Sequence, residues 1–90
     1  MTTIGDIMSR FAHDPFTLGA AVRDARVSAG RTQAEVAQAA HCSRQWLVGF
    51  ERGDRSRAEA DVVFRVLHAL GLHVRLEAIP EPGDEELLPL

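Results

Sequence analysis

Apolar residues recur with helical spacing in four stretches of this 90-residue chain. Positions three and four apart lie on one face of a helix, which packs inward while the polar residues face solvent. The four predicted inward faces are Leu18, Ala21, Val22, Ala25 and Ala29; Val36, Ala37 and Ala40; Leu47 and Phe50; and Val62 or Val63, Val66, Leu67 and Leu70. We therefore predict a mainly α-helical chain.

Capping residues predict where these helices begin and end. Asp14 followed by Pro15 suits the start of the first helix, because proline lacks the N–H that a first turn leaves unpaired. Thr32 and Glu35 form a capping box for the second helix. A similar box over residues 56–59 is predicted to start the fourth, and glycine is predicted to end three of the helices, at Gly30, Gly53 and Gly71.

Residues 31–53 place the second and third predicted helices back to back. Ser43 caps the third helix, so only a short turn separates the two. Two short helices joined in this way form the sequence pattern of a helix-turn-helix. Ala37 fits this arrangement, because its small side chain lets the next helix cross closely. We expect the rest of the chain to hold, dimerise or adjust this unit.

The spacing of apolar residues changes from helical to alternating over residues 72–79. Leu72, Val74, Leu76 and Ala78 alternate with polar residues, which predicts a β-strand with one apolar face. A lone strand leaves its backbone groups unpaired, so we expect it to pair antiparallel with the same strand of a second copy. These four residues are the predicted dimerisation contacts of a homodimer.

Charge is distributed unevenly along the chain. The net charge is −3, yet residues 17–57 carry seven arginines against four acids (+3), and residues 77–90 carry five acids and no base (−5). A basic centre beside an acidic tail is expected when one part of a protein meets phosphate. Every basic residue other than histidine is arginine, whose planar guanidinium can make bidentate contacts with phosphate or guanine.

Several classes of protein are not favoured by the sequence. No apolar run approaches the roughly 18 residues of a membrane span, and the N-terminus has no signal-peptide core, so we expect a cytoplasmic protein. The single cysteine, Cys42, fits a reducing compartment. The four histidines lack ligand spacing, and no catalytic constellation or glycine-rich phosphate loop is present. We therefore predict no metal, no cofactor and no enzymatic activity.

The runs TQAEVAQAA, SRQWL and FERG together resemble the XRE-type (Cro-type) helix-turn-helix of phage repressors and bacterial regulators. The continuation RVLHALGLHVRLE, a helix running into a single strand, is similar to HipB-type antitoxins, whose toxins are HipA-like serine/threonine kinases. The resemblance covers residues 17–79. It implies a lambda-repressor-like bundle of four to five helices with one C-terminal strand, an intertwined homodimer, binding to a pseudo-palindromic operator with autorepression, and binding of a toxin on another face.

The resemblance also implies roles for individual residues. By position, Gln33 holds a phosphate and braces the third helix, while Ser43, Arg44 and Gln45 meet base edges in the major groove of double-stranded DNA. Physical chemistry agrees, because helix N-termini attract phosphate, arginine grips guanine and glutamine can grip adenine. The predicted phosphate contacts from the flanking segments are arginines: Arg31, Arg52, Arg55 and Arg57.

Three residues depart from the family pattern. His41 stands where the turn usually has glycine, and histidine tolerates a left-handed conformation better than most residues. Gly49 replaces a residue that often contacts a base, at a helix-propensity cost of roughly 1 kcal/mol. Trp46 is expected to be partly exposed beside the reading residues, where it either contacts a sugar or thymine methyl as a further base-contact residue or shields the core around Leu47.

The two ends are predicted to lie outside the domain of residues 15–79. Helical spacing in residues 1–14 predicts a short helix; an unstructured lead and an arm that contacts DNA or toxin are the alternatives. The acidic, proline-containing tail of residues 80–90 is expected to be disordered. The favoured function is a repressor that serves as the antitoxin of a type II toxin–antitoxin pair. The alternatives are a free-standing regulator and an adaptor that binds only protein.

Overall fold

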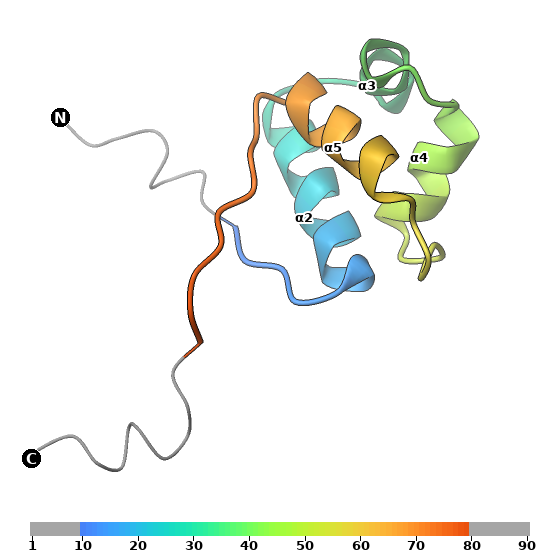
Figure 1. Ribbon diagram of the computed structural model, residues 1–90. Helices are drawn as coiled ribbons and strands as arrows, with labels where there is room; N and C mark the ends of the chain where they lie inside the picture. The colour runs from blue at the N-terminus through green and yellow to red at the C-terminus, as the bar shows by residue number, and fades with distance from the viewer. Residues whose placement is uncertain (1–9, 80–90) are drawn as a thin grey trace, which may run out of the picture.

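The computed structural model describes residues 10–79, and within them four α-helices enclose one core (Figure 1). The predicted acidic tail and most of the predicted N-terminal helix lie outside the described residues. Residues 10–14 are described and are not helical. The helices are α2 (Pro15–Ser28), α3 (Gln33–Ala40), α4 (Arg44–Glu51) and α5 (Ala60–Ala69).

The predicted start and end of α2 are confirmed. The side chain of Asp14 accepts from the N–H of Thr17, and the Thr17 hydroxyl accepts from the N–H of Asp14, which completes a capping box. Pro15 occupies the first turn. The helix stops before Gly30, whose φ of 69° is in the left-handed region that glycine adopts without steric cost.

The core contains most of the apolar side chains that the helical spacing predicted. Ala29 is the exception: it is exposed, because α2 ends at Ser28 and Ala29 is its C-cap. Its largest fully buried members are Val22, Val36, Leu47, Phe50 and Val66, so each helix contributes at least one. Val63 is buried and Val62 only partly so, which settles the alternative left open by the sequence. In this arrangement α3 packs on α4 and α5, while α2 packs on α4.

Gly19 lets α2 and α4 approach at backbone distance. Gly19 is buried, and a Cβ atom at this position would overlap the carbonyl oxygen of Phe50. Glycine is therefore required here for space and not for an unusual backbone conformation. The close approach fixes the position of α4 on α2, and with it the position of the helix-turn-helix in the bundle.

The prediction for the start of α5 was wrong. Residues 56–57 form a turn, and α5 begins at Ala60 with Glu59 as an N-cap that makes no side-chain hydrogen bond. Ala58 packs against the core, which carries the chain through this turn before the helix can begin. Asp61 supplies the negative charge that favours a first helical turn.

Two arginines tie the ends of α3 and α5 to each other. Arg65 in α5 donates from Nε to the carbonyl oxygen of Ala40 at the end of α3, at 2.9 Å. Arg31, just before α3, donates from Nη1 to the carbonyl oxygen of Ala69 at the end of α5, at 2.6 Å. Each guanidinium satisfies a carbonyl that a helix C-terminus leaves unpaired and complements the negative end of the helix dipole.

The segment of residues 72–79 begins with Leu72 packed partly against the core and then runs away from the bundle (Figure 1). Gly71 has a φ of 71° and ends α5 as predicted. Within the described residues this segment forms neither helix nor strand, and Val74, Leu76 and Ile79 are exposed. A strand here needs a neighbouring strand for its backbone groups, so the strand and the homodimer remain predictions.

Candidate nucleic-acid interface

The turn between α3 and α4 has the conformation that the sequence predicted. His41 adopts φ 57° and ψ 44°, the left-handed conformation, directly after the last residue of α3. The N–H of Cys42 donates to the carbonyl oxygen of Ala37 at 3.0 Å, which satisfies one of the last acceptors of the helix. The turn therefore forms with histidine in place of glycine.

Cys42 is partly buried and packs against the core from the turn. Burial raises the pKa of its thiol, with a smaller opposing effect from the charge of Arg65. The thiol is therefore a packing group at neutral pH, since the thiolate is the nucleophilic form.

The N-terminus of α4 is presented to solvent. Ser43 caps it, with its hydroxyl oxygen accepting from the N–H of Trp46 at 2.9 Å. Ser43, Arg44 and Gln45 are all exposed, so the structure brings the three predicted base-contact residues together at one helix end. The positive end of the helix dipole adds to the charge of Arg44 at this point.

The expectation that Trp46 is partly exposed was wrong. The residue is 8% exposed, and its ring stacks on Phe50 with centroids 5.0 Å apart. The guanidinium carbon of Arg55 lies 5.5 Å from the centroid of the Trp46 ring, and Arg55 Nε donates to the Trp46 carbonyl oxygen at 3.1 Å. Trp46 therefore belongs to the core, which favours its shielding role over base contact.

Arg55 also explains Gly49. A Cβ at position 49 would lie 3.3 Å from Arg55 Nε, closer than most packed carbons. Because glycine has no Cβ, another group can approach the backbone at this position closely. Among the described residues, the approach to Gly49 is made by the protein's own arginine. Arg55 is half-buried by these contacts, so its guanidinium is already used within the fold and is less accessible to phosphate than an exposed arginine.

The other arginines predicted to contact phosphate differ in burial and in their contacts within the protein. Arg31 is partly buried and bonded to the end of α5, as described above. Arg52 is exposed, with its Nε 3.7 Å from the carboxylate of Asp54, a loose surface pair. Arg57 is exposed in the turn before α5. Of the four arginines predicted to contact phosphate, Arg55 included, Arg52 and Arg57 therefore remain accessible to DNA.

A polar network links Gln33 at the start of α3 to both ends of α4. Gln33 Nε2 donates to Glu51 Oε1 at 3.1 Å, and Arg44 Nη2 donates to Gln33 Oε1 at 3.5 Å. The bracing predicted for Gln33 is therefore visible in the fold. Arg26 in α2 completes the network through a salt bridge of 2.7 Å to Glu51.

Sequence reasoning missed both members of this salt bridge. Polar residues of the predicted helices were expected to face solvent, yet the side chain of Arg26 is only 12% exposed and that of Glu51 is 1% exposed. The signal available in the sequence was weak: a glutamate follows the core residue Phe50, and an arginine follows the buried Ala25 by one position. Neither spacing shows that the two charges meet across α2 and α4.

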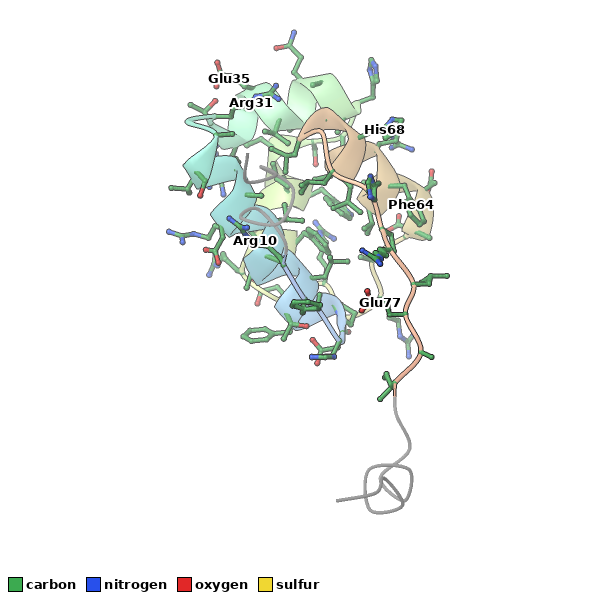
Figure 2. The ribbon with its side chains drawn as sticks, turned by 90° about the vertical axis from the view of Figure 1, so that its left-hand side faces the viewer. Arg10, Arg31, Glu35, Phe64, His68 and Glu77 are labelled. Carbon is green, nitrogen blue, oxygen red and sulfur yellow. The ribbon has the colours of Figure 1, made fainter. Side chains whose placement is uncertain are left out.

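The predicted dimerisation residues lie apart from this surface. Leu72 packs partly against the core, whereas Val74 and Leu76 are exposed on the departing segment. Phe64 and His68 protrude from α5 on the side along which this segment runs (Figure 2), and together with Leu72 and Val74 they line a shallow groove.

Comparison with known proteins agrees with this geometry. A family model described as a helix-turn-helix domain matches residues 17–78, which is more than half of the chain. A comparison with curated proteins gives no match. In the part of the chain that the structure describes, no helix is long and apolar enough to cross a membrane. The matched residues run from α2 into the segment after α5 and include all of the interface described above, so the chain belongs to the helix-turn-helix domain family, which indicates a DNA-binding transcription regulator.

Proposed function

We propose that this protein is a sequence-specific repressor that reads double-stranded DNA with the N-terminus of α4. The observation that carries the proposal is the exposure of Ser43, Arg44 and Gln45 together on a capped helix end, in a chain that matches a helix-turn-helix domain. Such an end fits the major groove, where side chains at the start of the recognition helix reach base edges.

Each residue has a role that follows from its chemistry. Arg44 donates two hydrogen bonds to O6 and N7 of a guanine, and Gln45 pairs with N6 and N7 of an adenine. Gln33 lies at the start of α3, where the helix N-terminus attracts a phosphate. Arg52 and Arg57 contact the DNA backbone and supply affinity without sequence preference.

The proposed functional unit is a homodimer acting in the cytoplasm. Two copies paired through residues 72–79 place two recognition helices about 34 Å apart, so the operator is a pseudo-palindrome with half-sites one turn apart. The exposed, alternating apolar residues of this segment support the pairing. Binding of the dimer at its own promoter represses the operon.

The finer proposal is that the regulator is the antitoxin of a HipA-like kinase. It is supported by the resemblance of residues 65–77 to HipB-type antitoxins. The alternative is a free-standing regulator without a toxin. A protein-only adaptor is less favoured, because the exposed helix end would then have no use.

DNA binding is tested with two matched arginine variants on sequences selected from a random duplex pool. Arg44→Ala is expected to lose about 1–3 kcal/mol of preference at one base pair, while Arg57→Ala weakens selected and random duplexes about equally. Equal losses from both variants on both kinds of DNA would contradict the assigned roles. Absence of any DNA affinity at about 50 mM salt would favour the adaptor.

The antitoxin role is tested by the neighbouring gene and its product. A kinase-like reading frame beside this one, whose product copurifies with this protein and loses toxicity when the two are expressed together, supports the proposal. A regulator that controls its promoter with no such neighbour is a free-standing one.

A further inference from the structure

Glu51 in α4 is a buried carboxylate whose described hydrogen-bond partners are Arg26 in α2 and Gln33 in α3. Its side chain is 1% exposed. Oε2 accepts from Arg26 Nε at 2.7 Å, while Oε1 accepts from Arg26 Nη2 at 3.0 Å and from Gln33 Nε2 at 3.1 Å. The remaining Arg26 nitrogen, Nη1, donates to the carbonyl oxygen of Arg31 at 2.8 Å. Arg26 and Glu51 therefore form a bidentate pair anchored to the backbone before α3.

This pair determines which way the Gln33 amide faces. An ionised carboxylate only accepts hydrogen bonds and a guanidinium only donates them. Gln33 lies between the carboxylate of Glu51 and the guanidinium of Arg44, so its amide nitrogen must face Glu51 and its amide oxygen must face Arg44. Reversing the amide would place oxygen against carboxylate and N–H against guanidinium. The amide orientation, which is often ambiguous for glutamine, is fixed here by its two neighbours.

The contact between Gln33 and Arg44 suits a group that directs a base reader. Arg44 Nη2 lies 3.5 Å from Gln33 Oε1, a loose hydrogen bond on an exposed side chain. It biases the direction of the guanidinium while leaving the other N–H donors available to a base. A flexible arginine oriented in advance loses less conformational freedom on binding.

We propose that Glu51 is a specificity-determining positioning residue: through Gln33 it orients Arg44 for base recognition. Glu51 itself touches no DNA. The inference rests on the proposed function, because it needs Arg44 to read a base. It differs from a purely structural role, in which the Arg26–Glu51 pair only fastens α2 to α4.

The two roles are separated by a variant that keeps the bundle and removes the carboxylate. Removing one member of a buried ion pair leaves an unpaired charge, so Glu51→Gln is expected to be less stable. Replacing both members with apolar side chains of similar size commonly restores stability, so Arg26→Met with Glu51→Met is the informative variant. Gln33→Met gives a second test, because it interrupts the path to Arg44 and leaves the ion pair in place. Glu59→Gln is the control, since Glu59 is exposed and makes no side-chain cap bond.

The readout is base discrimination by folded protein. A consensus duplex is selected with the wild type, the base pair read by Arg44 is identified from Arg44→Ala, and the affinity ratio for the correct and altered pair is measured for each variant. Helical circular dichroism confirms folding at the assay temperature. We expect the ratio to fall about tenfold in the Arg26→Met/Glu51→Met variant and in Gln33→Met, and to stay unchanged in Glu59→Gln.

The possible outcomes distinguish this inference from the proposed function. If the wild type discriminates and the folded Arg26→Met/Glu51→Met variant discriminates equally well, Glu51 is only structural. If that variant does not fold, Gln33→Met decides in the same way, because a full wild-type ratio in it overturns the inference. If the wild type prefers no sequence at all, the proposed function itself fails.

Discussion

The guanidinium of Arg55 lies over the indole ring of Trp46, 5.5 Å from its centroid, while Arg55 Nε donates to the Trp46 carbonyl oxygen. The loop after α4 is thereby fastened to the start of that helix. Removing the guanidinium removes a cation–π contact and a hydrogen bond, each worth about 1 kcal/mol. We expect Arg55→Met to lower the free energy of unfolding by about 1–2 kcal/mol and to shift Trp46 emission to longer wavelength.

Urea unfolding followed by fluorescence measures both effects, because Trp46 is the only tryptophan in the chain. Arg57→Met is the control, since Arg57 is an exposed arginine in the same loop. If the two variants had equal stability and unchanged emission, the contact over Trp46 would contribute nothing measurable.

Gly19→Ala is expected to be among the most damaging small substitutions in the chain. The added methyl group overlaps the backbone oxygen of Phe50, which a side-chain rotation cannot relieve. We expect the free energy of unfolding to fall by about 1–3 kcal/mol or more, which is measured as a lower melting temperature. Gly49→Ala is the matched control in another helix, where the group that must yield is the flexible side chain of Arg55 and the alanine favours the helix. A Gly19→Ala melting temperature at or above that of Gly49→Ala would contradict the close approach of α2 and α4.

Two exposed carboxylates at helix starts make the stability depend on acid pH. Hydrogen bonds from the backbone of Thr17 lower the pKa of Asp14 below its usual 3.8, and hydrogen bonds from the backbone of Thr32 lower the pKa of Glu35 below its usual 4.5. Because the folded pKa values are the lower ones, this stabilisation is complete above the usual values and is lost as the pH falls through the folded values.

Glu35→Gln should therefore differ most from the wild type near neutral pH and converge with it in acid. Urea unfolding at a series of pH values between about 6 and 3 tests this. Glu59→Gln should run parallel to the wild type throughout, because Glu59 caps α5 without a side-chain bond. A constant gap between Glu35→Gln and the wild type down to the lowest pH would show that the carboxylate bond of the capping box does not stabilise the fold.

The proposed homodimer has a preferred strand register. Arg75 and Glu77 lie on one face of the C-terminal segment, with Arg75 Nε 3.2 Å from Glu77 Oε2. Directly opposite residues of an antiparallel pair share a face. A two-fold axis through Leu76 therefore sets Arg75 against the partner's Glu77 twice, whereas an axis through Arg75 sets arginine against arginine. We predict the register with Leu76 on the axis.

Charge exchange tests this register. Arg75→Glu and Glu77→Arg should each weaken the dimer about tenfold by placing like charges across the strands, and the double variant should recover it. Sedimentation equilibrium gives the dissociation constants. If the wild type is a monomer at micromolar concentration, the proposed dimer is wrong. If the wild type, the two single variants and the double variant all have equal dissociation constants, only the proposed register is wrong.

The sequence predicted the parts of the fold that depend on local chemistry. The capping box of Thr32 and Glu35 and the left-handed His41 follow from neighbouring residues, and the core follows from helical spacing. The contacts that it did not predict join residues far apart in the chain. Arg26 and Glu51 are 25 positions apart, as are Arg65 and Ala40, and a charged residue carries no mark of a distant partner.

The candidate site was predicted in the same uneven way. The exposure of Arg44 and Gln45 follows from their place just after the cap, where a helix face turns to solvent. Trp46 stacks on Phe50 and is contacted by Arg55 from the next loop, and spacing within α4 cannot show the contact with Arg55. The start of α5 was misplaced because a capping-box pattern over residues 56–59 competes with the packing of Ala58.

The inward-turned arginines change how this protein should respond to counterions. Residues 17–57 carry seven arginines, but Arg26, Arg31 and Arg55 are bonded within the bundle, which leaves Arg23, Arg44, Arg52 and Arg57 exposed. Each phosphate neutralised on duplex DNA contributes about −0.9 to the slope of log affinity against log salt, so the exposed arginines of this segment can account for a slope of at most about −4 per subunit. The salt dependence of DNA affinity is therefore set by the guanidinium groups that the fold leaves exposed, and a count of all arginines in the sequence would overestimate it.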